Sequence, residues 1–266
     1  MANVGTPNPS ATAGDAISRG EATAGSAMPL FYRRPVALSA ALHSELSLSG
    51  AENYAFARNT NSIPLTLNEF EFACRHYPIV FTASKPSFPV AVTGIEKDRN
   101  LFVDELGRWR DGAYIPAYVR RYPFILLEDT QNKGFTLGID TAAERVKDAA
   151  GREAKFFWQG RPTELTQRAL TVCMEYQVNA NAARVFCDEL EAEDLLVEKE
   201  AGFDLNSGRK LRLTGFRIVD EARFEKMTGK AFLRFHRRHW LRPIYLHLIS
   251  AGNWANLLDM AAKGFG

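Results

Sequence analysis

The residues best suited to chemistry form a basic and aromatic segment near the C-terminus. Five cations, two histidines and three aromatic side chains lie between Lys230 and Arg242, without a single acid. Cations bind phosphates and aromatic rings stack on bases, so this composition would suit an anionic partner. At helical spacing, however, the cations surround the helix and do not form one stripe. We therefore interpret the segment as an amphipathic helix with its aromatic side chains packed inward. The alternative is a surface that binds carboxylates of another protein.

His236 and His239 in this segment are weak candidates for a metal site. Their i, i+3 spacing would place two imidazoles on one face of a helix. A third ligand would have to come from His247, His76 or a carboxylate, and the chain contains no HExxH, CxxC or facial-triad spacing. The neighbouring arginines also disfavour a bound cation. We predict no metal centre.

Motifs of nucleophilic and nucleotide-dependent catalysis are missing from the sequence. It contains no GxSxG elbow, no GxxxxGK[ST] loop and no GxGxxG fingerprint. Cys74 and His76 stand two residues apart, which points them to different sides of a helix, so Cys74 is predicted to be a core thiol. We predict no cofactor and assign no catalytic residue. The balance favours a protein without enzymatic activity.

The segment from Tyr114 to Phe124 is the best candidate for a binding surface. It gathers tyrosines and arginines around two prolines, just before a predicted buried strand. Recognition surfaces are enriched in these residue types, and the expected partner is another protein or a peptide. The predicted binding residues are Tyr114, Tyr118, Arg120, Arg121 and Tyr122. The alternative is that the tyrosines pack on the edge of a sheet and the arginines only face solvent.

Composition restricts where the protein works and what it binds. The chain has 266 residues and a formal net charge of +2, too small to indicate a polyanionic partner, so nucleic acid is not expected. No apolar run approaches the 20 or so residues of a membrane span, and the N-terminal residues lack the apolar core of a secretory signal. The three cysteines form no CxxC pair and are predicted to be free thiols. Together these features predict a soluble, cytoplasmic protein.

The order of the predicted elements indicates an α+β fold. Residues 1–28 are expected to be a disordered tail, because they carry too little apolar surface to form a core. Residues 29–150 predict a mostly antiparallel sheet with one or two packed helices, and residues 151–266 a long helix, a β-hairpin and a helical C-terminal tail. We expect these regions to form one integrated domain over residues 29–260.

Local signals place several of these elements. Thr66 and Glu69 form a capping box that starts a helix, and buried strands are predicted at 77–82, 88–95 and 122–127. Weaker strands are expected at 44–48, 54–57, 62–65, 100–103 and 135–139. Residues 140–153 look like a linker, and a helix is predicted over 164–197 with a kink or break at Asn179 and Asn181. The hairpin is expected to turn at Asn206-Ser207-Gly208.

Four stretches, in order along the chain, carry a family resemblance: Glu52–Arg58, His76–Phe81, Tyr114–Phe124 and Ile244–Leu248. They resemble the SapC family of bacterial proteins, over roughly 29–258. The family name refers to genes linked to a bacterial surface layer, and members tend to lie beside flavin-dependent halogenases, cupin-type proteins and outer-membrane receptors. The resemblance supplies no catalytic residues. A peptide-uptake permease has the same name, but a permease requires several long apolar segments that this chain lacks.

Three functions follow from this resemblance and the residues. The first is a non-catalytic binding or accessory protein that serves surface-layer, outer-membrane uptake or protein-modification machinery. The missing catalytic motifs and the segment at 114–124 favour it. The second is a metal-dependent, oxygenase-like enzyme, suggested by the neighbours of family members and by the scattered histidines. The third, a structural component of the surface layer, fits neither free thiols nor a missing export signal.

Overall fold

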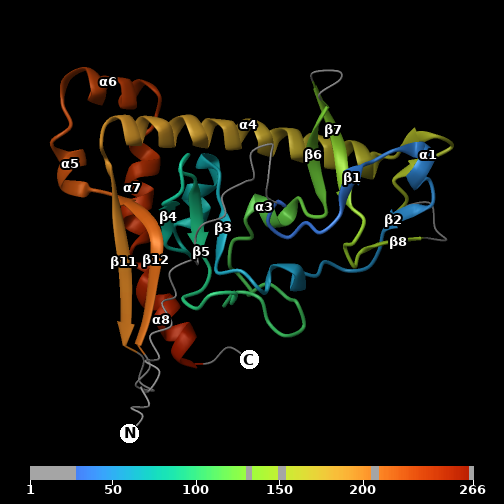
Figure 1. The fold of residues 1–266 in the computed structure, drawn as a ribbon, viewed down its shortest axis with the longest axis horizontal. Helices are drawn as coiled ribbons and strands as arrows, with labels where there is room; N and C mark the ends of the chain where they lie inside the picture. Colours follow the sequence, from blue (N-terminus) through green and yellow to red (C-terminus); the bar gives the residue numbers. More distant parts are fainter. Residues whose placement is uncertain (1–27, 130–133, 149–153, 205–209, 264–266) are drawn as a thin grey trace, which may run out of the picture.

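The computed structural model describes residues 28–129, 134–148, 154–204 and 210–263 (Figure 1). Nearly all of the predicted N-terminal tail and the whole predicted turn at 206–208 therefore lie outside the described residues. The order of strands and helices gives an α+β fold with a long helix, a hairpin and a C-terminal helical tail, as predicted.

A five-stranded antiparallel sheet forms one half of the molecule. Its strands follow the order β11-β12-β4-β5-β3. They are β3 (Ser62–Pro64), β4 (Ile79–Thr82), β5 (Pro89–Val92), β11 (Leu196–Asp204) and β12 (Lys210–Val219). Every residue of β4 and β5 is buried, which explains why both strands show continuous apolar runs and no alternation. The sheet combines β3, β4 and β5 from the predicted region 29–150 with β11 and β12 from the predicted region 151–266. The division of the chain into these regions stays a prediction.

Smaller sheets form the other half of the molecule. A three-stranded sheet has the order β1-β7-β6, and two separate two-stranded sheets pair β2 with β8 and β9 with β10. The strands are β1 (Pro35–Ala37), β2 (Leu46–Leu48), β6 (Phe124–Asp129), β7 (Gly134–Asp140), β8 (Val146–Asp148), β9 (Phe157–Trp158) and β10 (Arg161–Pro162). β8 lies within the stretch that was predicted to be a linker.

The helix α4 (Glu164–Ala192) connects the two halves. Its 29 residues are about 43 Å long, and its buried side chains recur every three or four residues. The helix runs without a break through Asn179 and Asn181, so the predicted break there is wrong. Figure 1 shows α4 passing along both the β6–β7 and the β11–β12 strands.

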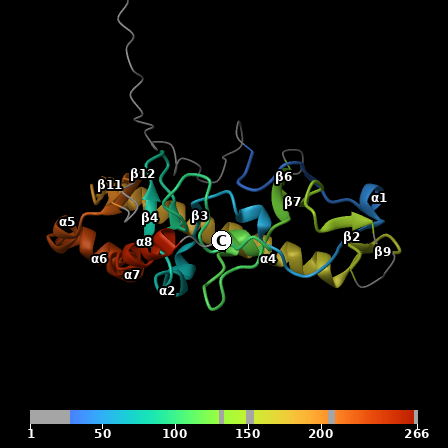
Figure 2. The same cartoon turned by 90° about the horizontal axis from the view of Figure 1, so that it is seen from below.

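Shorter helices pack at defined places around this frame. They are α1 (Ala40–His43), η1 (Ala55–Ala57), η2 (Leu67–Glu69), α2 (Phe70–Ala73), α3 (Ala117–Arg120), α5 (Glu221–Glu225), α6 (Gly229–Arg237), α7 (Leu241–Ser250) and α8 (Asn253–Lys263). Seen from below, α5 to α7 gather at one end of the molecule, and α1, β2 and β9 lie at the other (Figure 2). Within the described ranges, no helix is long and apolar enough to cross a membrane.

Some local predictions are confirmed and others are wrong. The capping box is present at η2, where the carboxylate of Glu69 accepts from the backbone N–H of Thr66 at 2.8 Å. The stretch 54–57 forms the 3₁₀ turn η1 and no strand. The stretch 100–103 contributes only one isolated bridge, between Val103 and Trp109. Both errors concern short apolar stretches, for which periodicity cannot separate a strand from a turn.

Candidate functional site

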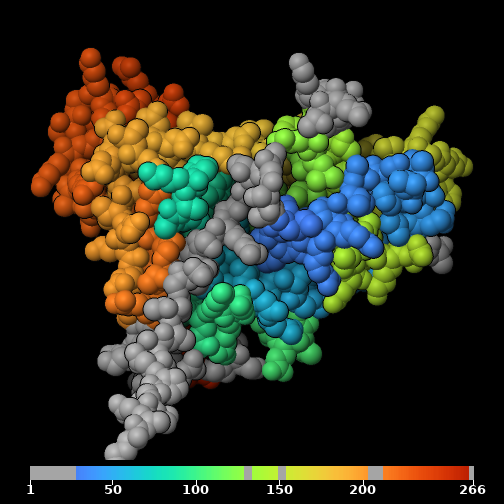
Figure 3. Space-filling view, viewed as in Figure 1, coloured from blue at the N-terminus to red at the C-terminus, as the bar shows by residue number. Residues whose placement is uncertain are grey.

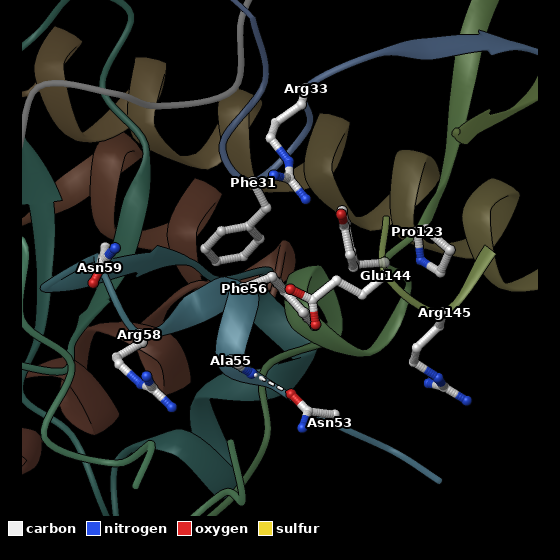
Figure 4. A pocket seen from close by; sticks show the side chains of 11 residues that line it. Phe31, Arg33, Asn53, Ala55, Phe56, Arg58, Asn59, Pro123, Glu144 and Arg145 are labelled. Carbon is white, nitrogen blue, oxygen red and sulfur yellow. Dashed lines mark hydrogen bonds between the residues drawn. The ribbon is translucent and has the colours of Figure 1, made fainter. Parts of the chain in front are cut away.

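A cleft of about 410 Å³ lies where three distant parts of the chain meet (Figure 4). The first described residues, dark blue in the space-filling view, lie against the segments coloured light blue and yellow-green, which supply other walls of the cleft (Figure 3). The lining residues are Phe31, Arg33, Asn53, Ala55, Phe56, Arg58, Asn59, Tyr122, Pro123, Glu144 and Arg145. Two of the four stretches with the family resemblance, 52–58 and 114–124, therefore meet in this cleft.

Aromatic rings form the apolar part of the cleft. The rings of Phe56 and Tyr122 lie 4.1 Å apart between centroids, and Phe31 contacts Phe56 edge-on at 5.2 Å. Phe31 has a φ of 77°, in a region that non-glycine residues rarely occupy. The surrounding structure must hold such a backbone in place, and the ring of Phe31 packs against Phe56, Tyr118 and Tyr122.

Three arginines supply the charge of the cleft. Arg33 donates to the carbonyl of Ala142 at 2.7 Å, and Arg145 donates to the carbonyls of Ser49 and Gly50 at 3.3 and 3.4 Å. Arg58 donates to the carbonyls of Asp104 and Glu105 at 3.0 and 2.6 Å. Within the described part of the chain, no carboxylate forms an ion pair with these arginines. Carbonyl partners orient each guanidinium without neutralising its charge.

The side chains that line the cleft differ in where they point. In Figure 4, Phe31, Arg33, Phe56 and Glu144 face the central space, and Arg58 and Arg145 extend on opposite sides of it. The side chain of Asn53 is held by the backbone, because its Oδ1 accepts from the N–H of Ala55 at 2.8 Å. The cleft thus presents an apolar floor, several cations and one exposed carboxylate.

Asp140 is the buried group that holds the cleft together. Its Oδ2 accepts from the backbone N–H of Arg33 at 3.0 Å and from the hydroxyl of Tyr122 at 3.1 Å. Its Oδ1 accepts from the backbone N–H groups of Arg34 and Ala142 at 2.8 and 3.1 Å. Burial by itself raises the pKa of this carboxyl, but the N–H donors outweigh burial and hold the pKa below its usual value. Asp140 therefore stays ionised and fixes the two walls that carry Arg33 and Tyr122.

Glu69 plays a similar role for the loop before α3. Beyond the capping box, its Oε1 accepts from the hydroxyl of Tyr114 at 3.0 Å and from the backbone N–H of Ala117 at 2.6 Å. The capping box was visible in the sequence, but these two contacts cross more than forty residues and were not. They fix the start of α3, which leads directly to Tyr122 at the cleft.

The predicted binding residues occupy three different environments. Tyr122 lines the cleft, whereas Tyr118 is fully buried behind it with its ring 5.7 Å from that of Phe31. Arg121 is buried between the rings of Tyr118 and Tyr176, at 4.3 and 4.0 Å from their centroids. Tyr114, which precedes α3, and Arg120, its last residue, are joined by a hydrogen bond of 3.3 Å from the guanidinium to the hydroxyl. Their role in binding stays a prediction.

The basic segment at 230–242 lies far along the chain from this cleft and forms α6 and the start of α7. Arg234 pairs with Glu189 at 2.9 Å and Glu193 at 2.5 Å of the long helix, and Phe235 is buried. His236 and His239 are exposed. Among the described residues, no group of three or more His, Cys, Asp or Glu side chains is arranged to hold a metal ion.

The other two stretches with the family resemblance, 76–81 and 244–248, meet at His247. Its Nδ1 lies 2.7 Å from the carbonyl of Ile79, and its Nε2 accepts from the backbone N–H of Val219 at 3.1 Å. This pair of contacts requires a neutral ring with its proton on Nδ1. Burial lowers the pKa of His247 to about 4, which keeps the ring neutral. His247 thus joins α7 to two strands of the large sheet.

Comparison with known proteins gives one match. The family model described as SapC matches residues 38–257, which is most of the chain. The chain belongs to the SapC family. No curated protein and no solved structure matches this SapC-family chain significantly.

Sequence reasoning missed most residues of the cleft. Phe31 and Arg33 directly follow the predicted tail, and Glu144 and Arg145 lie in the stretch that was predicted to be a linker. The available signal was the resemblance itself, since the stretch 52–58 contributes four lining residues. Its convergence with Tyr122 depends on long-range packing that spacing along the chain does not reveal.

Proposed function

We propose that this SapC-family protein is a non-catalytic binding protein whose cleft holds an acidic, aromatic segment of a partner protein. The observation that supports the proposal best is the state of the three cleft arginines, which are oriented by main-chain carbonyls and form no ion pair with a described carboxylate. A carboxylate of the ligand would supply that missing charge through charge-assisted hydrogen bonds.

The remaining lining residues narrow the chemistry of the ligand. Phe31, Phe56 and Tyr122 offer ring faces and edges to an aromatic or aliphatic side chain. Glu144 and Asn59 offer acceptors for the backbone N–H groups of a peptide. A peptide with an acidic residue next to an aromatic one would use all three kinds of group, which a simple anion would not.

We further propose that the protein works in the cytoplasm as an accessory to surface-layer, uptake or protein-modification machinery. The three buried thiols are all free, as is usual in a reducing compartment. Four donors from three chain segments converge on Asp140, so the cleft is built before any ligand arrives. A preformed site of this kind favours binding because little order has to be created.

Selection from a displayed library of random short peptides tests the proposal. We expect enrichment of sequences with Asp or Glu beside Phe, Tyr or Trp, and loss of that enrichment in the variant Arg33→Gln/Arg145→Gln. The matched control is Arg75→Gln/Arg161→Gln, which removes two exposed arginines outside the cleft. Enrichment of neutral or basic peptides, or equal enrichment by the cleft variant, would contradict the proposal.

A further inference from the structure

A second concave surface lies at the opposite end of the chain, between the hairpin and the C-terminal helices. This groove has a volume of about 1080 Å³ and is lined by β11, β12, α5 and α7. Its apolar floor includes Tyr245 and Ile249, which are 54% and 68% exposed, together with the partly buried Val197, Ile218 and Leu248. Large apolar side chains that are exposed together are typical of interaction surfaces.

Carboxylates surround this apolar floor. The groove is lined by Glu198, Asp220, Glu221 and Glu225, against Lys199 as the single cation of its lining. The carboxylate of Asp220 already has partners within the chain, because it caps α5 and lies 3.4 Å from the guanidinium of Arg223. In the part of the chain that the structure describes, the other three glutamates form no ion pair. The groove therefore suits a segment that is both basic and apolar.

The helix α6 of the same chain has the complementary surface. Lys230, Leu233 and Arg237 follow one another at i, i+3 and i+7, so they share one face of the helix. That face lies opposite the buried Phe235, and Leu233 is 51% exposed. Lys230 and Arg237 have no ion-pair partner among the described carboxylates, whereas Arg234, which borders the same face, is paired with Glu189 and Glu193 of α4.

We propose that α6 of one copy docks into the acidic groove of a second copy, which makes the protein a self-associating one. Leu233 packs on the apolar floor beside Tyr245 and Ile249, and Lys230 and Arg237 approach Glu198 and Glu225. The basic helix and the groove both lie at the end of the molecule that carries α5 to α7 (Figures 1 and 2). Two copies related by a two-fold axis can therefore exchange both contacts at once.

The two-fold arrangement also increases the surface area buried between the two copies. A stable interface needs about 800 Å² from each partner, which one short helix does not supply. In a two-fold dimer each copy buries both its own α6 and its own groove, so each copy contributes two surfaces. The interface depends on charge and is expected to weaken with salt, because exposed ion pairs are screened.

Sedimentation of the full chain over a wide range of concentration, at low and high salt, tests this inference with two charge-reversed variants. The groove variant is Glu198→Lys/Glu225→Lys, and the helix variant is Lys230→Glu/Arg237→Glu. All four positions are exposed, so the fold should survive the changes. We expect the native chain to form dimers, and each variant alone to associate at least about tenfold more weakly.

Recombining the charges gives the sharpest result. A chain with both sets of reversals has a basic groove and an acidic helix, so it should recover dimer formation, and an equimolar mixture of the two variants should recover part of it. The control Asp111→Lys/Glu175→Lys raises the net charge by the same amount as the groove variant does, at exposed positions outside the groove, and should associate like the native chain. A native chain that stays monomeric, or reversals that change association no more than the control does, would overturn the inference.

Discussion

Replacing Asp140 with Asn probes the construction of the cleft most directly. The substitution keeps one carbonyl oxygen but replaces the other with an amide NH₂, which faces two of the four donors that Asp140 now satisfies. Hydrogen bonds to a charged acceptor contribute about 1.5–3 kcal/mol each, and donors left unsatisfied in the interior add to the loss. We therefore expect the free energy of unfolding to fall by about 4 kcal/mol.

Urea denaturation at neutral pH, followed by tryptophan fluorescence, measures this loss. Asp111→Asn is the matched control, because Asp111 is exposed and its substitution should change stability by less than about 0.5 kcal/mol. A loss below about 1 kcal/mol for Asp140→Asn would refute the reasoning, since it would mean that the four donors find other acceptors.

The pH dependence gives an independent check on the same carboxylate. The folded state holds the pKa of Asp140 below its unfolded value, so its contribution to stability is complete above the unfolded pKa of about 3.9. That contribution is lost as the pH falls through the lower, folded pKa. The free energy of unfolding of Asp140→Asn should therefore fall less on acidification than that of the native protein.

Two further groups make separate predictions. Burial lowers the pKa of His247 to about 4. The free energy of unfolding should therefore fall as the pH drops from about 6.5 towards 4, by up to about 1.4 kcal/mol per pH unit from this group. His247→Gln should remove that slope when unfolding by urea is measured across this pH range. An unchanged slope would contradict it. Arg217 is buried and pairs with Glu191 at 2.7 Å, so Glu191→Ala should cost about 3–5 kcal/mol by leaving the charge uncompensated. Arg217→Met combined with Glu191→Leu should recover most of that stability in thermal denaturation, and equal losses in both variants would count against the pairing.

The sequence predicted those features of the fold that depend on local signals. The capping box at Thr66 and Glu69 is confirmed because both partners lie within one turn. The strands β4 and β5 were recognisable as continuous apolar runs, since both are buried throughout. The long helix was visible from its spacing, but Asn179 and Asn181 do not break it, because the interior Ala180 and Ala183 anchor the helix on either side of Asn181.

The cleft could not be predicted in the same way, because its residues come together only through tertiary packing. Tyr122 was the one predicted binding residue that lines it. Tyr118 and Arg121 were expected at a surface, but the turn of α3 directs them into the aromatic interior. The carbonyls that orient Arg33 and Arg145 lie about a hundred residues from them along the chain, which no spacing rule anticipates.

A double-mutant cycle on peptide binding tests the central claim most directly. An enriched peptide and its Asp→Asn or Glu→Gln analogue are each titrated calorimetrically against the native protein and against Arg33→Gln/Arg145→Gln. We expect the two changes to be coupled by at least about 1 kcal/mol, because each removes one partner of the same charge-assisted contact. Additive losses, with no coupling between the carboxylate of the peptide and the arginines of the cleft, would contradict the account.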